Sequence, residues 1–247
     1  MKFQVIIPAR YASSRFPGKP LAMLGSKPMI QWVYERAKSV IDDVCVATDD
    51  QRIYNKVIEF GGNVVMTQTT HRSGTDRICE ACNLLNTDAD VVVNLQGDEP
   101  FVNPEQIRQL MNCFSNSLTQ IATLVRPFQA DEDIFNPNIV KAVFAQDNGR
   151  ALYFSRAAIP CLRGVEQAEW SKKHTYYAHI GMYAYRLETL RYITHLSPSP
   201  LEQAESLEQV RWLEAGIPVT VALTQHPTIG IDTPEDLLQA QLLVGKL

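Results

Sequence analysis

Short apolar runs rich in β-branched residues recur in the first hundred positions, and amphipathic stretches separate them. The runs occupy residues 3–7, 44–48, 64–67 and 91–95. Unbroken apolar runs of this length are typical of strands that are buried on both faces. Between them, apolar residues within 29–40 and 53–58 recur at helical spacing, and Gly61 and Gly62 end the second of these segments. The alternation predicts a parallel sheet with right-handed helical crossovers.

The pattern changes beyond Ile121. Residues 140–145 and 151–154 flank an Asp-Asn-Gly turn and predict a β-hairpin. Strand-like patterns follow at 178–185 and 219–223, and a helical pattern at 201–213. Asn103 and Thr233 each precede a proline and predict helix starts, because each combines a capping side chain with proline at the first helical position. The sequence therefore predicts an α/β fold without an internal repeat.

Composition narrows the function classes. The 247 residues are 45% hydrophobic and 20% charged, which is typical of a globular chain. The formal charge of −4 argues against nucleic acid as a partner. No apolar run approaches the roughly 18 residues of a membrane span, and the amino terminus lacks a secretory pattern. We therefore expect a cytoplasmic location, with the cysteines at 45, 79, 82, 113 and 161 as thiols packed in the core.

The segment PARYASSRFPGKPL, residues 8–21, directly follows the first predicted strand. It carries Arg10, Arg15 and Lys19 among Ser13, Ser14 and Gly18. Loops after parallel strands lie at the ligand-binding edge of open α/β sheets. Cations and hydroxyls on a close backbone suit a triphosphate, although a solvated basic loop would have the same composition. The glycine spacing matches neither a Walker loop nor a Rossmann fingerprint.

Two acidic positions are candidate metal ligands. Asp98 stands in QGDEP, residues 96–100, directly after the fourth apolar run. A carboxylate there can hold Mg²⁺ between protein and phosphate oxygens, although Gly-Asp is also a common turn. Asp232 precedes the Thr233 cap, and its alternative role is that of an acid at a helix start.

Further polar candidates follow other predicted elements. The segment HRSGT, residues 71–75, offers donors for a base or phosphate, or caps for a helix. Arg156 follows a predicted strand, His179 lies in one, and Glu208 and Gln209 lie on a predicted helix. An arginine fork would suit an acidic substrate. Cys79 and Cys82 lack the second cysteine pair that a zinc ribbon requires.

The string IPARYASSRFPGKPL, residues 7–21, resembles the amino-terminal signature of the 3-deoxy-manno-octulosonate (Kdo) cytidylyltransferases. The resemblance spans essentially the whole chain. Its further segments, in order, are VATDD (46–50), HRSGTDR (71–77), VVNLQGDEP (92–100), FNPNIVK (135–141), ALYFSRAAIP (151–160), HIGMYAYR (179–186), LEQVR (207–211) and IDTPEDL (231–237).

This resemblance implies a three-layer α/β/α fold with a mainly parallel, nucleotide-diphospho-sugar transferase-like (Rossmann-like) sheet and a β-hairpin extension used in dimerisation. It implies one domain over 1–247, with 1–120 mainly binding CTP and 121–247 mainly binding sugar and forming a homodimer. The implied reaction is attack of the anomeric hydroxyl of Kdo on the α-phosphorus of CTP. Diphosphate leaves, and CMP-Kdo forms for lipopolysaccharide synthesis.

The resemblance also implies roles for individual residues. Lys19, Arg10 and Asp98 would be catalytic, and Asp98 and Asp232 would bind Mg²⁺. The residues expected to contact CTP are Ala9, Arg10, Ser13, Arg15, Lys19, Arg72, Ser73 and Gly74. Those expected to contact Kdo are Gln96, Arg156, His179, Tyr183, Glu208 and Gln209. Cys161 and Leu162 depart from the aromatic residue and aspartate that are common in the family, so the resemblance implies no contact for that loop.

Three alternatives remain open. The acceptor could be 8-amino-Kdo or an N-acylneuraminate, and the IDTPEDL and YFSR strings favour Kdo only over the latter. A non-catalytic, regulatory protein that binds sugar nucleotides is an alternative of a different class. The presence of Lys19, Asp98 and Asp232 together argues against it.

Overall fold

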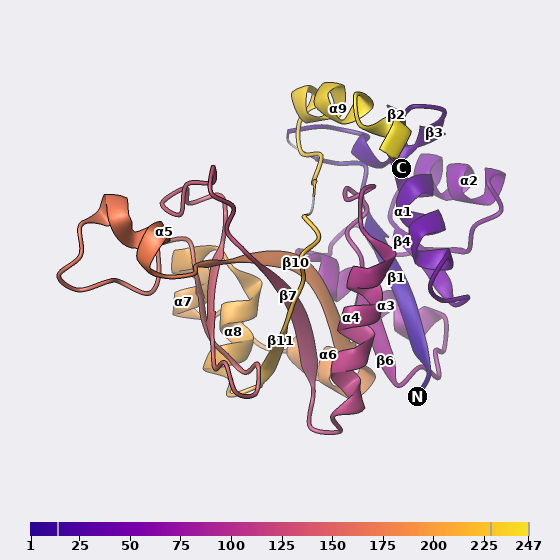
Figure 1. The fold of residues 1–247 in the computed structure, drawn as a ribbon. Coiled ribbons are helices and arrows are strands. Elements are labelled where there is room, and N and C mark those ends of the chain that lie inside the picture. The colour runs from indigo at the N-terminus through magenta and orange to yellow at the C-terminus, as the bar shows by residue number, and fades with distance from the viewer. Residues whose placement is uncertain (14, 228, 247) are drawn as a thin grey trace.

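Strand β1 (Phe3–Ala9) lies inside a twisted sheet that forms the centre of the molecule (Figure 1). The computed structural model describes residues 1–13, 15–227 and 229–246, so Ser14 of the signature segment lies outside the described residues. The strands follow the order β11 (Val219–Leu223), β7 (Ile121–Pro127), β10 (Tyr177–Arg186), β6 (Val91–Asn94), β1, β4 (Val44–Thr48) and β5 (Val64–Met66).

The sheet is mainly parallel, as the sequence predicts. β1 pairs in parallel with β4 and β6, β4 pairs in parallel with β5, and β11 pairs in parallel with β7. β10 runs antiparallel between β6 and β7. Because β10 comes from the second half of the chain and β6 from the first, the two halves share one continuous sheet.

The predicted hairpin is confirmed as β8 (Lys141–Phe144) and β9 (Ala151–Ser155), and β8 also pairs with β10. Its turn requires glycine for two reasons. Gly149 has φ +69°, and a Cβ there would lie 2.7 Å from the Val221 carbonyl oxygen. The turn thus packs directly against the edge strand β11.

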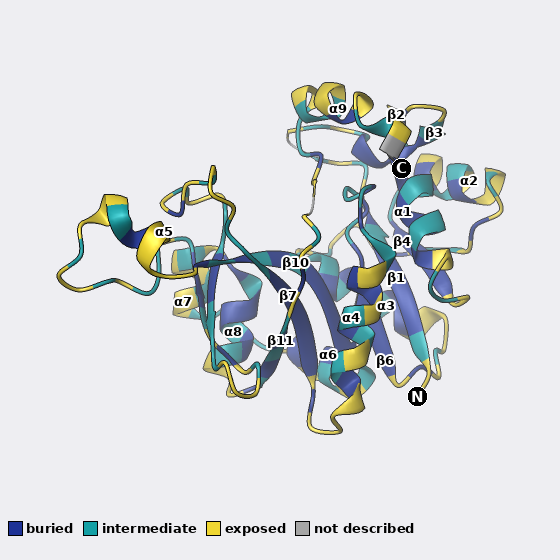
Figure 2. Ribbon diagram, viewed as in Figure 1, coloured by how far each residue is buried: buried dark blue, intermediate teal, exposed yellow. Residues whose placement is uncertain are grey.

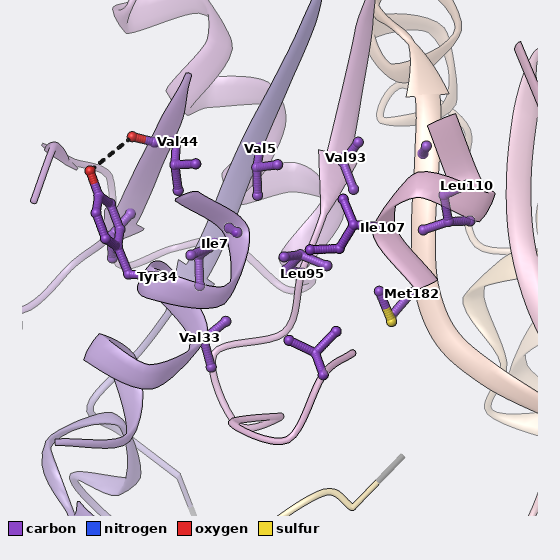
Figure 3. Packing of buried hydrophobic residues seen from close by; sticks show 14 of the residues in the cluster. Val5, Ile7, Val33, Tyr34, Val44, Val93, Leu95, Ile107, Leu110 and Met182 are labelled. Carbon is purple, nitrogen blue, oxygen red and sulfur yellow. Dashed lines mark hydrogen bonds between the residues drawn. The ribbon is translucent and has the colours of Figure 1, made fainter. Parts of the chain in front are cut away.

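Helices cover both faces of the sheet. The first core packs α1 (Met29–Lys38), α2 (Gln51–Glu59) and α4 (Pro104–Asn112) against one face. Figure 3 shows part of this core, where Ile7 of β1 lies near Val33, and the Tyr34 hydroxyl donates to the Val44 carbonyl. The second core packs α3 (Gly74–Leu84), α6 (Leu187–Ile193) and α8 (Glu208–Glu214) against the other face. The result is the three-layer α/β/α arrangement that was expected.

The predicted helix starts are confirmed. Asn103 and Thr233 both form capping boxes with the third residue of the helix that follows. Thr233 begins α9 (Pro234–Gln241), which packs near the short strands β2 (Met23–Leu24) and β3 (Lys27–Pro28) at the top of Figure 1. The remaining short elements are η1 (Lys19–Leu21), η2 (Cys113–Ser115), η3 (Gln167–Glu169), α5 (Trp170–Lys173) and η4 (Val244–Lys246).

The prediction of one helix over 201–213 is wrong. The segment forms α7 (Pro200–Glu205) and α8, and Ser206 between them adopts a left-handed conformation with φ 52°. Arg156 stabilises the break, because its guanidinium donates to the carbonyls of Glu205 (2.7 Å) and Ser206 (3.3 Å). The spacing of apolar residues does not reveal this break, because the donor that satisfies its carbonyls lies in another part of the chain.

The cysteine prediction is only partly correct. Cys45, Cys79 and Cys82 are buried free thiols, but Cys113 is half-buried and Cys161 is exposed. Cys161 lies in the segment between β9 and η3. The loop that leads to α5 projects from the rest of the molecule and is largely exposed (Figure 2). Among the described residues, no helix is long and apolar enough to cross a membrane.

Candidate active site

The carboxyl ends of β1, β4 and β6 lie at one edge of the sheet, because these strands run parallel. Four parts of the chain meet at this edge. They are the segments that follow β1 and β6, the start of α3, and the segment directly before α9. Together they line a cavity of about 230 Å³. All eight residues expected to contact CTP line it: Ala9, Arg10, Ser13, Arg15, Lys19, Arg72, Ser73 and Gly74.

Lys19 lies at the centre of this site. Gly18 takes the left-handed conformation with φ 72°, and Lys19 then begins η1 with its side chain directed into the cavity. The ammonium donates to Asp98 Oδ2 at 2.5 Å and to Asp232 Oδ1 at 3.0 Å, although only 8% of the residue is exposed. Arg15 reaches the other oxygen of Asp232 at 3.1 Å. Three segments far apart in the chain therefore meet at one amine.

Backbone contacts fix both aspartates. The Asp98 carbonyl accepts a hydrogen bond from the Ile231 amide at 3.1 Å, which joins the loop after β6 to the segment directly before α9. The Asp236 carboxylate accepts from the amides of Asp232 and Thr233 at 3.0 and 2.9 Å. The capped start of α9 thus fixes the position of the Asp232 backbone.

The donor set at this point fits a divalent cation. A single ammonium already contacts both Asp98 and Asp232, so a positive charge of small radius is accommodated between them. Within the described ranges, no group of three or more His, Cys, Asp or Glu side chains could hold a metal ion. A metal here would therefore need ligands from outside the protein, which suits Mg²⁺, because this ion commonly binds one or two carboxylates together with substrate phosphates.

The cavity is locally positive in a chain of net charge −4. Five cationic side chains line it, namely Arg10, Arg15, Lys19, Arg72 and Arg77, against the carboxylates of Asp98 and Asp232. Arg10 and Arg72 are exposed. A polyanionic ligand would be attracted to such a surface over a distance of about a Debye length.

The start of α3 forms one wall of the cavity. Ser73 caps the helix by accepting from the Asp76 amide at 3.1 Å, and Arg72 precedes it. Arg77, one turn further on, is buried, with its guanidinium at 2.6 Å from both Asp49 and Thr67. Backbone donors, a cap and a buried cation thus share one helix start.

A second cavity, of about 520 Å³, adjoins the first, and both are lined by Arg72 and Ser73. Of the residues expected to contact Kdo, Gln96 lines the first cavity and Glu208 the second. The Glu208 carboxylate accepts from the Thr75 hydroxyl at 3.0 Å and from Arg211 at 3.2 Å. Burial raises the pKa of Glu208, whereas these two partners act to lower it.

The other four residues expected to contact Kdo line neither of these cavities: Arg156, His179, Tyr183 and Gln209. The guanidinium of Arg156 donates to three main-chain carbonyls, those of Pro137, Glu205 and Ser206. The donors of this guanidinium are therefore already hydrogen-bonded within the protein. Gln209 and Tyr183 are buried, and the Tyr183 ring packs edge-on against Trp212.

His179 is held as a neutral ring. Burial lowers its pKa to about 3, and Nε2 lies 2.9 Å from the Thr123 hydroxyl. That hydroxyl has a single proton and lies 2.8 Å from the Met182 carbonyl, which can only accept. We therefore assign the ring proton to Nε2. In this state the ring carries no charge with which to attract a carboxylate.

The sequence analysis gave no individual role to Glu99 or Arg77, and it considered Thr75 only as part of the HRSGT segment. Burial raises the pKa of Glu99 to about 8, and the charges of Asp98 and Asp232 add to the effect. All three residues stand beside selected ones, within QGDEP and HRSGTDR. The polar residues of these two segments could have been treated as a set, because they follow predicted strands at the same sheet edge.

The fold and the cavity define an α/β nucleotidyltransferase, and comparison with known proteins agrees. The cytidylyltransferase family model matches residues 4–222. A putative glucose-1-phosphate thymidylyltransferase from Bacillus anthracis shares the fold with a TM-score of 0.68 at 20% identity, covering 99% of this chain and 96% of that one.

More similar proteins specify the family. The 3-deoxy-manno-octulosonate cytidylyltransferase of Parabacteroides distasonis is 58% identical over 244 residues, which is 97% of each chain. A structure of CMP:2-keto-3-deoxy-manno-octonic acid synthetase complexed with CTP has a TM-score of 0.91 at 42% identity, covering 100% of this chain and 99% of that one. The chain belongs to the 3-deoxy-manno-octulosonate cytidylyltransferase family.

Proposed function

We propose that this protein transfers the cytidylyl group of CTP to Kdo, which yields CMP-Kdo and diphosphate. The observation that carries the proposal is the position of Lys19 between Asp98 and Asp232 in a cavity lined by four arginines. The names of the similar proteins support it, since they specify this acceptor and, for the solved structure, CTP.

The chain's own residues would act mainly by position and charge. Arg10, Arg15 and Lys19 would bind the triphosphate and stabilise the charge that grows on the leaving diphosphate, with Lys19 as the main catalytic cation. Arg72, Ser73 and Gly74, with Ala9, would frame the cytosine. Positioning and electrostatics supply most of the acceleration in such phosphoryl-type transfers.

Mg²⁺ is part of the proposal. Asp98 and Asp232 would hold it, and the ion would supply charge neutralisation at the phosphates together with orientation of the attacking sugar hydroxyl. In this structure the Lys19 ammonium pairs with both carboxylates. If a cation binds these carboxylates instead, we expect the ammonium to contact the phosphates.

Gln96 and Glu208 are the proposed sugar contacts that border a cavity. Glu208 can accept hydrogen bonds from sugar hydroxyls. The sugar carboxylate needs a cation, and Arg156 could supply one only if it exchanged at least one of its main-chain carbonyl partners for the substrate. His179, Tyr183 and Gln209 stay in the proposed sugar set, although they line neither cavity.

Homodimer formation and a cytoplasmic location are separate proposals. The hairpin and the edge strand β11 expose Leu152 and Leu223 to 53% and 46%. Burial of such side chains would favour association through the second half of the chain. Sedimentation equilibrium of the purified protein would distinguish a dimer from a monomer.

The test is release of diphosphate from CTP by the purified protein with Mg²⁺ and Kdo. Parallel reactions would replace Kdo with 8-amino-Kdo or N-acetylneuraminate, and CTP with other nucleoside triphosphates. Release that needs both CTP and Kdo supports the proposal, whereas turnover of another acidic sugar alone would change the acceptor. If no reaction released diphosphate, the result would favour the non-catalytic binding protein. Lys19→Ala is the matched control and is expected to be inactive.

A further inference from the structure

The loop formed by residues 10–18 is attached to the start of α2 by a contact that the proposed mechanism does not use. The Arg52 guanidinium lies over the Tyr11 ring, with Cζ 3.3 Å from the ring centroid. The same guanidinium donates through Nε and Nη2 to the two oxygens of Asp50, at 2.9 and 2.7 Å. Asp50 also caps α2 by accepting from the Arg52 amide at 2.9 Å. Arg52 thus stacks on the loop while its guanidinium is paired with Asp50.

Tyr11 in turn closes the loop. Its carbonyl accepts from the Gly18 amide at 2.9 Å, which joins the two ends of residues 11–18. Gly18 has φ +72°, and a Cβ at this position would lie 2.9 Å from Tyr11 Cε2. Glycine is required on both counts, since the conformation is left-handed and the tyrosine ring fills the space. A contact at Tyr11 therefore acts on the whole loop.

Residues of the loop border the first cavity, but the residues that form the contact between Arg52 and Tyr11 do not. Arg10, Ser13 and Arg15 of the loop line the first cavity, as does Lys19 directly after it, whereas Tyr11, Asp50 and Arg52 do not. Arg52 does not border the cavity, and the loop residue on which it stacks is Tyr11. We propose that Arg52 is a positioning residue whose stacking on Tyr11, fixed by Asp50, preorganises the loop for nucleotide binding. This inference rests on the proposed function in one respect, namely that the nucleotide is CTP.

The physical reason is preorganisation. Arg10 and Arg15 are exposed, and none of the described residues between them, Tyr11, Ala12 and Ser13, is fully buried. Such loops open locally at low cost in free energy, and a ligand that must first order them binds more weakly. A planar guanidinium can stack on a ring and grip a carboxylate at the same time, which a lysine ammonium cannot do. The Arg52 side chain lowers the pKa of Asp50, as expected for this pairing.

The first experiment measures the Kd for CTP by calorimetry with Mg²⁺. Arg52→Ala and Arg52→Lys are each expected to weaken binding about five- to tenfold, because both lose the stacked fork. Tyr11→Phe keeps the ring and should stay within about twofold of the wild type. In steady-state assays the KM for CTP should rise while the KM for the sugar does not. Equal CTP affinity in the wild type and both Arg52 variants would overturn the inference.

The second experiment does not depend on the nucleotide. Trypsin cleavage after Arg15 without ligand, followed by mass spectrometry, should be about five- to tenfold faster in Arg52→Ala, since cleavage follows loop opening. Lys56→Ala is the matched control, because it removes a surface ion pair with Glu59 from the same helix. Unchanged cleavage would refute the positioning role. If the wild type bound no CTP, the proposed function would fail, while faster cleavage of Arg52→Ala would still support the contact.

Discussion

Lys19 joins three parts of the chain through one amine, so its two partners provide a test of the site at the scale of single residues. Asp98 is about one-third exposed and Asp232 about half, whereas the lysine side chain is almost buried. Each aspartate can therefore be changed without disturbing the core. Their importance should appear in turnover far more than in folding.

Asp98→Asn is expected to lower the rate of diphosphate release by roughly a hundredfold or more, since it removes a proposed Mg²⁺ ligand and leaves Lys19 paired only with Asp232. The free energy of unfolding should fall by only about 1 kcal/mol. Asp88→Asn is the control, because Asp88 is exposed, pairs with Lys2 and precedes β6 at the opposite edge of the sheet. Normal turnover in Asp98→Asn would contradict the metal assignment.

His179 makes stability depend on pH in a direction that follows from its burial. The folded pKa is about 3, below the usual 6.5, so only the unfolded chain gains a proton at this site in mild acid. The contribution is complete above pH 6.5 and is lost as the pH falls from 6.5 towards 3. Between pH 7.5 and 5.5 this group should lower the free energy of unfolding by about 1 kcal/mol.

Urea denaturation at both pH values would measure this effect. His179→Gln should lose that part of the pH dependence, although its stability at pH 7.5 should also fall, since the packing of the ring on Phe154 disappears. If both proteins lost the same free energy between the two pH values, the ring would not be held neutral.

At the scale of elements, a side-chain hydrogen bond joins the first turn of α3 to the start of α8. Thr75 in the first turn of α3 is buried and donates to Glu208, the first residue of α8. The start of α3 also forms the wall between the two cavities. The hydroxyl thus fixes a carboxylate of the proposed sugar site from the helix that borders the nucleotide site.

Thr75→Val should raise the KM for the sugar about three- to tenfold, because Glu208 loses its donor and its charged form becomes harder to maintain. The KM for CTP should change by less than about twofold, and Thr75→Ser should restore the wild-type value, because it keeps the hydroxyl. Steady-state kinetics with each substrate varied in turn would separate these effects. A rise in the KM for CTP alone would place Glu208 outside the sugar site.

Local signals account for how well the elements could be predicted. The strand at 44–48 and the hairpin were predictable because β-branched runs and an Asn-Gly turn act locally, and the start of α4 because of its cap. Strand β7 was missed, because it begins where the apolar pattern changes and its pairing with β10 is set by distant residues. The break at Ser206 was missed for the same reason, since Arg156 stabilises it from 50 positions away.

The candidate site was predictable in part. Arg10, Lys19 and Asp98 follow strands of a parallel sheet, so topology alone brings them to one edge. Asp232 was harder to place, because it is 213 positions from Lys19 and the start of α9 brings it there. The engaged guanidinium of Arg156 could not be predicted, since its partners are main-chain carbonyls and carry no sequence signal.

At the scale of the whole molecule, the site links the two ends of the chain. Gln241 of α9 donates to the Met23 carbonyl at 2.8 Å and accepts from the Gly25 amide at 2.9 Å. Ile231, Leu24 and Met29 form a small core beside these contacts. The carboxy-terminal segment therefore docks on the amino-terminal one, and the cavity exists only while both are folded.

Ligand binding should consequently stabilise the whole chain. CTP with Mg²⁺ at about a hundred times its Kd should raise the free energy of unfolding by about 2.7 kcal/mol, because the unfolded chain has no site. Thermal unfolding with CTP, before and after chelation with EDTA, would measure the share that depends on the metal. Asp232→Asn should retain a CTP-dependent shift from the arginines but lose its sensitivity to EDTA. A shift in the wild type that chelation left unchanged would instead mean that the cations of the loop bind the triphosphate without a metal.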